Sequence, residues 1–315
     1  MAKNKVQFQK GLSLQNFFKQ FGTEEQCRTA LVQWRWPQGF VCPKCGHQKY
    51  CQLRNRKLFQ CSKCRHQSSL TSGSIFDNTK LPLNVWFLAI YFVTQSKKSI
   101  SALSLMRTVG VSYNSAHLMK HKIQQVMKER DDSQPLSSFI QVDDAYWGGK
   151  KRDGIRGRGA TGKIPFIAAV CSNAEGHPLR IRFSQIQSFS KESIKLWATK
   201  HVISSFTVTS DGLRCFLAFG DAGIHHKAIL TGGGPESVKI PEFKWVNTIL
   251  GNVKRFFHGI YHSLSERHFS KYLAEFCYRF NRRFNIAEMI PRFMYVAVRT
   301  PPRTQRFLRL AETHG

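Results

Sequence analysis

The second half of the chain carries short apolar runs that alternate with polar positions, and these predict strands. In residues 138–144, SFIQVDD, alternation places Asp143 on one face of a strand and Asp144 on the other. Asn173 and Gly176 interrupt a long apolar stretch, so the runs on either side form a hairpin. The predicted strands cover 138–144, 163–172, 177–184 and 205–212.

Longer stretches with helical spacing surround these strands. One helix, 190–202, follows Ser190 as a plausible N-cap and lies between the third and fourth strands. Two more, 242–260 and 265–284, follow the last strand. Strands that precede helices, with one crossover helix among them, predict an α/β fold: a mixed sheet flanked by helices.

Composition narrows the class of partner. The 315 residues suggest two or three domains, and 42% hydrophobic content is enough for a buried core. A net charge of +29 favours polyanions, nucleic acid first, although a ribosomal or merely basic protein has the same balance. Residues 81–96 are too short to span a bilayer, and the N-terminus lacks the apolar run of a secretion signal. We therefore expect a cytoplasmic protein without a membrane partner, nucleoid-associated if bacterial.

Two C-x2-C pairs predict a structural zinc site. Fifteen residues separate the pairs, a spacing typical of four-cysteine zinc sites, and four protein thiolates leave no open position for catalysis. The expected ligands of one Zn²⁺ are Cys42, Cys45, Cys61 and Cys64. Between the pairs, a short hairpin would offer Arg54, Arg56 and Lys57 to phosphates. A zinc ribbon that binds another protein is the alternative.

Residues 99–127 have the outline of a helix-turn-helix. Gly110 ends an apolar helix, and Ser112 can cap a second one. That second helix would present polar side chains to a major groove, although a plain helical hairpin fits nearly as well. The side chains are Tyr113, Asn114, His117, Lys120 and Lys122.

Acidic residues end two of the predicted strands. Asp143 and Asp211 would meet if their strands are neighbours, and paired carboxylates suit a hard metal ion. A turn-forming role is the alternative for each. A glycine-rich loop with six cations follows the first pair of acids and would guide phosphates. These cations are Lys150, Lys151, Arg152, Arg156, Arg158 and Lys163.

The helix at 242–260 supplies two further candidates. Asn247 and Lys254 are two turns apart and share one face, whereas Asn252 lies on another. The Asn247 amide oxygen can bind a hard cation, and Lys254 would reach a nearby phosphate or base. A polar residue near a helix N-terminus is the alternative for Asn247.

Several of these segments together resemble the insertion-sequence transposases of the DDE superfamily, specifically the ISXO-two-like group with an N-terminal zinc ribbon. The segments are WPQGFVCPKCG (36–46), CSKCRHQSSLTSGSIF (61–76), VDDAYWGGK (142–150), RGRGATGK (156–163), SDG (210–212) and VNTILGNVKRFFHGIYHSLSERHFSKYLAEFCYRFNRR (246–283). The resemblance implies a zinc-ribbon domain, a helical DNA-binding region, an RNase H-like catalytic domain and a basic C-terminal tail. Their expected bounds are 12–75, 76–132, 139–290 and 291–315.

The resemblance also implies the chemistry. Its catalytic residues fall on Asp143, Asp211 and Asn247, assisted by Lys254, with Asn where the wider superfamily has Glu. Glu275 is a fallback for the third position. Two Mg²⁺ ions would serve cleavage and strand transfer on double-stranded DNA, bound at the terminal inverted repeats by a homo-oligomer. The alternatives are an RNase H-like nuclease without strand transfer and a non-catalytic zinc-ribbon regulator.

Overall fold

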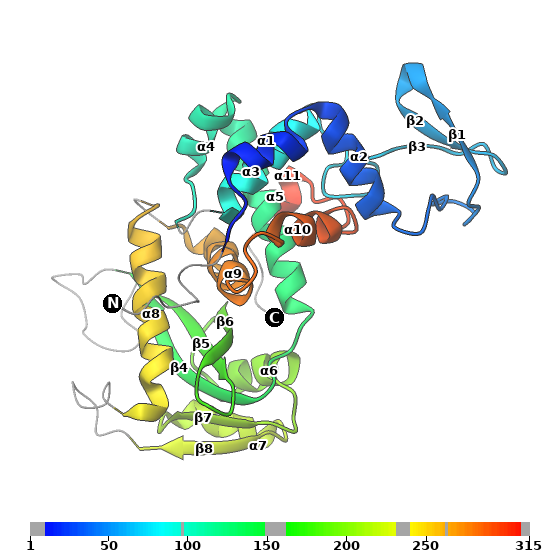
Figure 1. The fold of residues 1–315 in the computed structure, drawn as a ribbon. Helices are drawn as coiled ribbons and strands as arrows, with labels where there is room; N and C mark the ends of the chain where they lie inside the picture. The colour runs from blue at the N-terminus through cyan, green and yellow to red at the C-terminus, as the bar shows by residue number, and fades with distance from the viewer. Residues whose placement is uncertain (1–9, 96–97, 149–161, 231–239, 262–263, 310–315) are drawn as a thin grey trace. The chain divides into compact units, whose positions relative to one another are not determined.

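A computed structural model describes residues 10–95, 98–148, 162–230, 240–261 and 264–309 (Figure 1). The chain divides into two compact units. The first comprises residues 1–126 and 282–309, and the second comprises 127–281 with 310–315. No helix among the described residues has the length and apolar character needed to cross a membrane.

The first unit is built around a helical core. The capping box of Thr23 and Gln26 starts the second helix, and α3, the most apolar helix, is buried through Trp86, Phe87 and Ile90. The helices are α1 (Leu14–Phe21), α2 (Glu24–Arg35), α3 (Leu83–Gln95), α4 (Ala102–Val109), the first part of α5 (Tyr113–Asp132), α10 (Met289–Ala297) and α11 (Gln305–Arg309).

The C-terminal segment differs from the expected basic tail. Residues 291–309 contain most of α10 and all of α11, and they cluster with the first unit. Ile290, Phe293 and Met294 are fully buried, and α10 packs on α2 and α3. Apolar side chains at helical spacing explain the difference, because they require a core to cover them.

A small three-stranded antiparallel sheet forms the segment of this unit where the zinc ribbon is predicted, called the ribbon from here on. Its elements are β1 (Tyr50–Leu53), η1 (Arg54–Arg56), β2 (Leu58–Cys61) and β3 (Gln67–Ser69). Trp36 and Phe40 pack with Tyr50 and Phe59 as its aromatic core. Arg35 donates to the carbonyl of Leu70, which fastens the end of α2 to the ribbon.

A five-stranded mixed sheet organises the second unit, in the order β6-β5-β4-β7-β8. β4, β5 and β6 are antiparallel neighbours, whereas β7 runs parallel to β4 and β8 parallel to β7. This arrangement confirms the predicted α/β class. The strands are β4 (Phe139–Trp147), β5 (Ile164–Ser172), β6 (Pro178–Gln185), β7 (Thr207–Asp211) and β8 (His225–Ile229).

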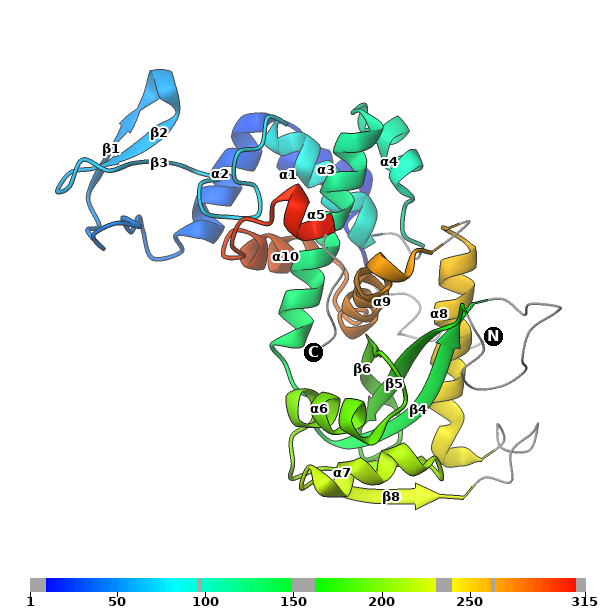
Figure 2. The ribbon, with the colours of Figure 1, turned by 180° about the vertical axis from the view of Figure 1, so that it is seen from behind.

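Helices cover both faces of this sheet (Figures 1 and 2). One core joins Ile140 and Val142 to Trp197, and the other joins Ala145 and Phe166 to Val253. The first face carries α6 (Lys191–His201), η2 (Arg214–Leu217) and α7 (Ala218–Asp221); the second carries α8 (Lys244–His258), preceded by η4 (Pro241–Phe243), and α9 (Glu266–Asn281). Successive residues of β4 therefore point into different cores.

A buried ionic cluster fixes the end of α5 to β6. The Arg182 guanidinium, 5% exposed, donates to the Asp132 carboxylate over 2.7 Å and to backbone carbonyls of Asp131 and Gln134. Asn281 donates to Asp131 over 3.1 Å. Such a cluster fixes the geometry where the chain enters and leaves the second unit, because unpairing a buried charge is costly.

Candidate functional site

Three carboxylates converge where β7 ends beside the middle of β4. Asp143, Asp144 and Asp211 each offer an oxygen within 4.8 Å of the others. The parallel register of β4 and β7 brings this about, since its last pair, Val142 with Ser210, places the next residues side by side. The two strands are adjacent, as expected, and β7 ends at Asp211. The expectation that Asp143 ends its strand is wrong, because β4 stays paired with β5 as far as Trp147.

Local hydrogen bonds fix the backbone next to Asp143 and Asp211. The Asp143 Oδ1 accepts the backbone N–H of Asp144 over 2.9 Å, and the Asp211 Oδ1 accepts that of Leu213 over 3.2 Å. Ser210 is fully buried and donates from Oγ to the Asp211 carbonyl over 2.9 Å. Its Oγ also lies 2.8 Å from His226 Nε2, and burial lowers the pKa of that imidazole.

Asp144 departs from the simple strand pattern. Alternation along the strand predicted that Asp144 points away from Asp143. Asp144 is on the same face of β4 as Val142, which packs in the first core. Its carboxylate nevertheless reaches within 4.8 Å of the other two, and all three side chains are half-buried. The pleat of β4 still alternates here, so it is the carboxylate end of Asp144 that lies near the other two, at the point where the β7 neighbour of β4 ends.

The two α8 candidates lie along the margin of the buried face of that helix. Val246 and Val253 pack in the second core, while Asn247 is half-buried and Lys254 exposed. Asn252 is exposed and accepts a hydrogen bond from Arg255 over 3.0 Å. Asn247 and Asn252 thus differ in burial, and the roles of Asn247 and Lys254 stay predictions.

Glu275, the fallback acid, lies elsewhere. Its side chain is fully buried on α9, where the Tyr261 hydroxyl donates to Oε2 over 3.4 Å. Among the described residues it joins no group of three metal-binding side chains. Nothing in its position favours it over Asn247.

The acidic cluster fits a hard cation. Its donors are carboxylate oxygens, with the Asn247 amide on the neighbouring helix, and Mg²⁺ prefers such ligands. A half-buried position leaves room for waters and a phosphate, which Mg²⁺ keeps among its ligands.

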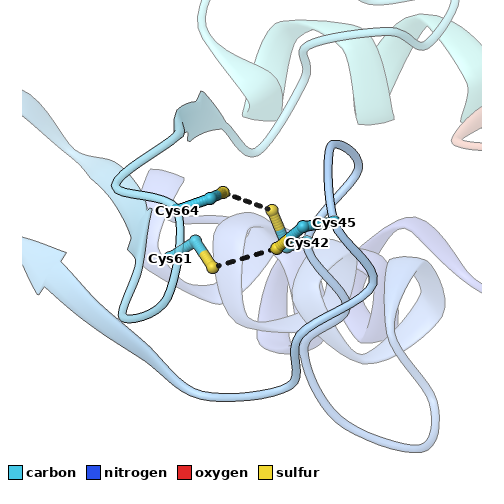
Figure 3. Close-up of side chains that lie close together, drawn as sticks. All are labelled: Cys42, Cys45, Cys61 and Cys64. Carbon is cyan, nitrogen blue, oxygen red and sulfur yellow. Dashed lines mark hydrogen bonds between the residues drawn. The ribbon is translucent and has the colours of Figure 1, made fainter.

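The four ribbon cysteines form the second candidate metal site (Figure 3). Two sulfur pairs, Cys42 with Cys64 and Cys45 with Cys61, are each 3.6 Å apart. A zinc ion with Zn–S bonds of about 2.3 Å requires sulfurs about 3.8 Å apart in a tetrahedron. The separation of the sulfurs fits zinc.

Both C-x2-C pairs have the same backbone turn. The N–H of Gly46 donates to the Cys42 carbonyl, and that of Arg65 donates to the Cys61 carbonyl. Both donors have positive φ, 71° at Gly46 and 57° at Arg65. The turn lets two sulfurs approach from one side, and Arg65 adopts it despite its side chain.

The predicted DNA-binding side chains differ in their exposure to solvent. Arg56 and Lys57 are exposed at the hairpin turn, where η1 also carries Arg54. Lys163 is half-buried before β5. The remaining predicted loop cations lie outside the described residues: Lys150, Lys151, Arg152, Arg156 and Arg158.

Lys120 and Lys122 correct the expectation for the second helix of the helix-turn-helix. Lys120 is 3% exposed and donates to the Ile100 carbonyl, and Lys122 donates to the Ile75 carbonyl over 2.8 Å. Both lysines donate to buried backbone carbonyls rather than facing solvent, because α5 is buried on every side over residues 119–127. Only its first turn, with Tyr113 and Asn114, is exposed to a partner.

The distribution of acidic residues along the sequence is a further signal, which the motifs did not reveal. Between Glu25 and Asp77 the chain contains no acidic residue but nine lysines and arginines. The entire ribbon lies inside this stretch. A count of acids along the sequence would have identified it as a positively charged module.

Comparison with known proteins adds two family-model matches and one similar protein. Residues 135–281 match a family model described as an ISXO2-like transposase domain, and residues 22–67 match a transposase zinc-ribbon domain. A protein of Halobacterium salinarum, described as an uncharacterized protein in transposable element ISH50, is 26% identical over 217 residues. The alignment covers 63% of this chain and 70% of that protein.

Proposed function

The chain belongs to the ISXO2-like transposases, and we propose that it binds the terminal inverted repeats of an insertion sequence and catalyses DNA cleavage and strand transfer. One observation carries the proposal: the matched domain contains three carboxylates that converge where β7 ends beside β4. Oxygen donors at such a position are what a metal-dependent phosphoryl transfer requires.

Asp143, Asp211 and Asn247 would hold the divalent ions, for which we propose two Mg²⁺. Bound there, the ions would activate the attacking oxygen and stabilise the leaving oxygen. The protein contributes position: the Leu213 N–H and the buried Ser210 hydroxyl fix the end of β7, and therefore Asp211. Exposed Lys254, two turns along α8 from Asn247, would bind the adjoining phosphate.

The ribbon is the proposed module for binding the transposon ends. Its support is the acid-free stretch, with Arg56 and Lys57 exposed at the hairpin turn and Arg54 beside them on η1. Phosphate contacts of this kind position a protein on the duplex without reading bases. The cations of 150–163 would guide the same strand near the metals. Two ends must meet one target, so we expect a homo-oligomer on DNA.

Cleavage of an end-bearing duplex tests the proposal. The duplex is taken from the DNA that flanks the gene, and cleavage is followed with Mg²⁺ for the wild type, Asp143→Asn and Asp211→Asn. We expect both variants to lose cleavage. The control is Asp221→Asn, which should retain cleavage: Asp221 is exposed and precedes the start of β8, whereas Asp211 pairs with Ile229 at the end of β8. Cleavage that persists in both site variants would refute the assignment. Cleavage without joining would identify a nuclease instead.

A further inference from the structure

We propose that Asp144 is a third carboxylate ligand of the divalent ions and supplies the negative charge that Asn247 lacks. The inference rests on the proposed function, because it concerns the same metal site. It goes further in giving a role to a residue that strand alternation places outside the site.

The pairing of the strands explains how Asp144 reaches the site. β4 pairs with β7 only as far as Val142, opposite Ser210, whereas on its other side it stays paired with β5 to Trp147. Asp144 therefore lies on the part of β4 that has lost its β7 neighbour. Its backbone N–H donates to the Asp143 Oδ1, which ties the two successive residues together at this edge.

The resulting geometry suits shared coordination. The carboxylate oxygens of Asp143, Asp144 and Asp211 lie within 4.8 Å of one another, a separation that one ion or a close pair of ions can bridge. A divalent cation among three half-buried carboxylates this close would offset their mutual repulsion. A bound cation would therefore stabilise the Asp144 carboxylate beside those of Asp143 and Asp211.

Charge counting gives the second argument. With Asp143 and Asp211 alone, two divalent ions would meet two negative charges from the protein, since the Asn247 amide is neutral. Asp144 raises the count to three, the number that a glutamate at position 247 would give. In this chain the third charge comes from β4 rather than from α8.

Metal binding by the full-length, zinc-loaded protein tests the inference without relying on activity. Mn²⁺ affinity is measured by titration calorimetry for the wild type, Asp144→Asn, Asp144→Glu and the exposed-acid control Asp221→Asn. Loss of a group that only hydrogen-bonds to a metal ligand typically weakens affinity about 10- to 100-fold. We expect at least this loss for Asp144→Asn, which removes a direct ligand. Asp144→Glu keeps the charge and should retain most of the affinity, and the control should match the wild type.

A rescue variant separates charge supply from a general structural effect. In Asp144→Asn, the additional change Asn247→Asp returns a carboxylate from α8, and we expect the Mn²⁺ affinity to recover most of the loss. A purely structural role of Asp144 would not be repaired from another helix, so failure of rescue would overturn the compensation.

Two outcomes distinguish the inference from the proposed function. If Asp143→Asn and Asp211→Asn bind Mn²⁺ weakly while Asp144→Asn binds like the wild type, Asp144 is not a ligand and the metal site stands. If all three variants bind Mn²⁺ like the wild type, the metal site itself is wrong, and the proposed function falls with it.

Discussion

His201 should make the stability of the second unit fall in mild acid. This side chain ends α6 and is 6% exposed, and its ring lies 5.6 Å from that of Trp197. Burial, with the positive charge of Arg182, lowers the pKa of His201 from 6.5 to about 3. The folded protein therefore keeps a neutral imidazole at pH values where the unfolded chain has protonated it.

The sign and size follow from this difference. Because the unfolded chain binds the proton more readily, His201 costs no stability above its unfolded pKa of 6.5, and the cost grows as pH falls toward 3. At about 1.4 kcal/mol per pKa unit, the loss between about pH 7.5 and pH 4.5 is about 2.5 kcal/mol. The Asp132 carboxylate loses its contribution in a lower window: burial opposes the effect, but Lys128 and Arg182 lower its pKa below 3.8.

Urea unfolding followed by tryptophan fluorescence across this pH range measures the effect. We compare the wild type with His201→Phe and with Val202→Ala, a buried neighbour that does not titrate. The free energy of unfolding of His201→Phe should gain about 2.5 kcal/mol on that of the wild type from about pH 7.5 to 4.5. Val202→Ala should keep a constant difference. A difference for His201→Phe that does not change with pH would refute the neutral, buried imidazole.

Three shorter predictions concern the ribbon and the ionic cluster. Cys64→Ser should lose the ribbon zinc, because three thiolates cannot complete the tetrahedron, and metal analysis that still finds full zinc would contradict the site. Arg56→Ala with Lys57→Ala should reduce the salt dependence of DNA affinity by about two ions, and an unchanged slope in fluorescence anisotropy titrations would exclude the hairpin turn from DNA. Arg182→Leu should destabilise the second unit by about 1–3 kcal/mol, because the carbonyls of Asp131 and Gln134 lose their donor and Asp132 keeps only Lys128. An unchanged melting temperature would show that the cluster is not needed.

Periodicity was sufficient for elements whose two faces differ. β4, β5 and β6 are flanked by turn residues, and Ser190 accepts the N–H of Ser193 as the predicted cap of α6. β8, HHKAI, was missed because an exposed edge strand needs no apolar period. Tertiary pairing therefore decides such a strand.

The site was predictable in part for a related reason. Asp143 and Asp211 were identified because each follows an apolar run, although β4 continues past Asp143 to Trp147. The sequence did not show that β7 ends beside Asp144. The lysines of α5 were misjudged because polar residues on a helix usually face water. Lys120 and Lys122 instead donate to backbone carbonyls inside the first unit, which only the packing of that helix reveals.

Joining of a pre-cleaved transposon end to target DNA tests the central claim most directly. A duplex with a free 3′-hydroxyl at the inverted repeat is incubated with a plasmid, Mg²⁺ and either the wild type or Asp211→Asn. We predict joined products for the wild type and none for the variant, whose β7 end keeps its fold but lacks the carboxylate. Equal joining by both proteins would contradict a metal-dependent strand transfer at this site.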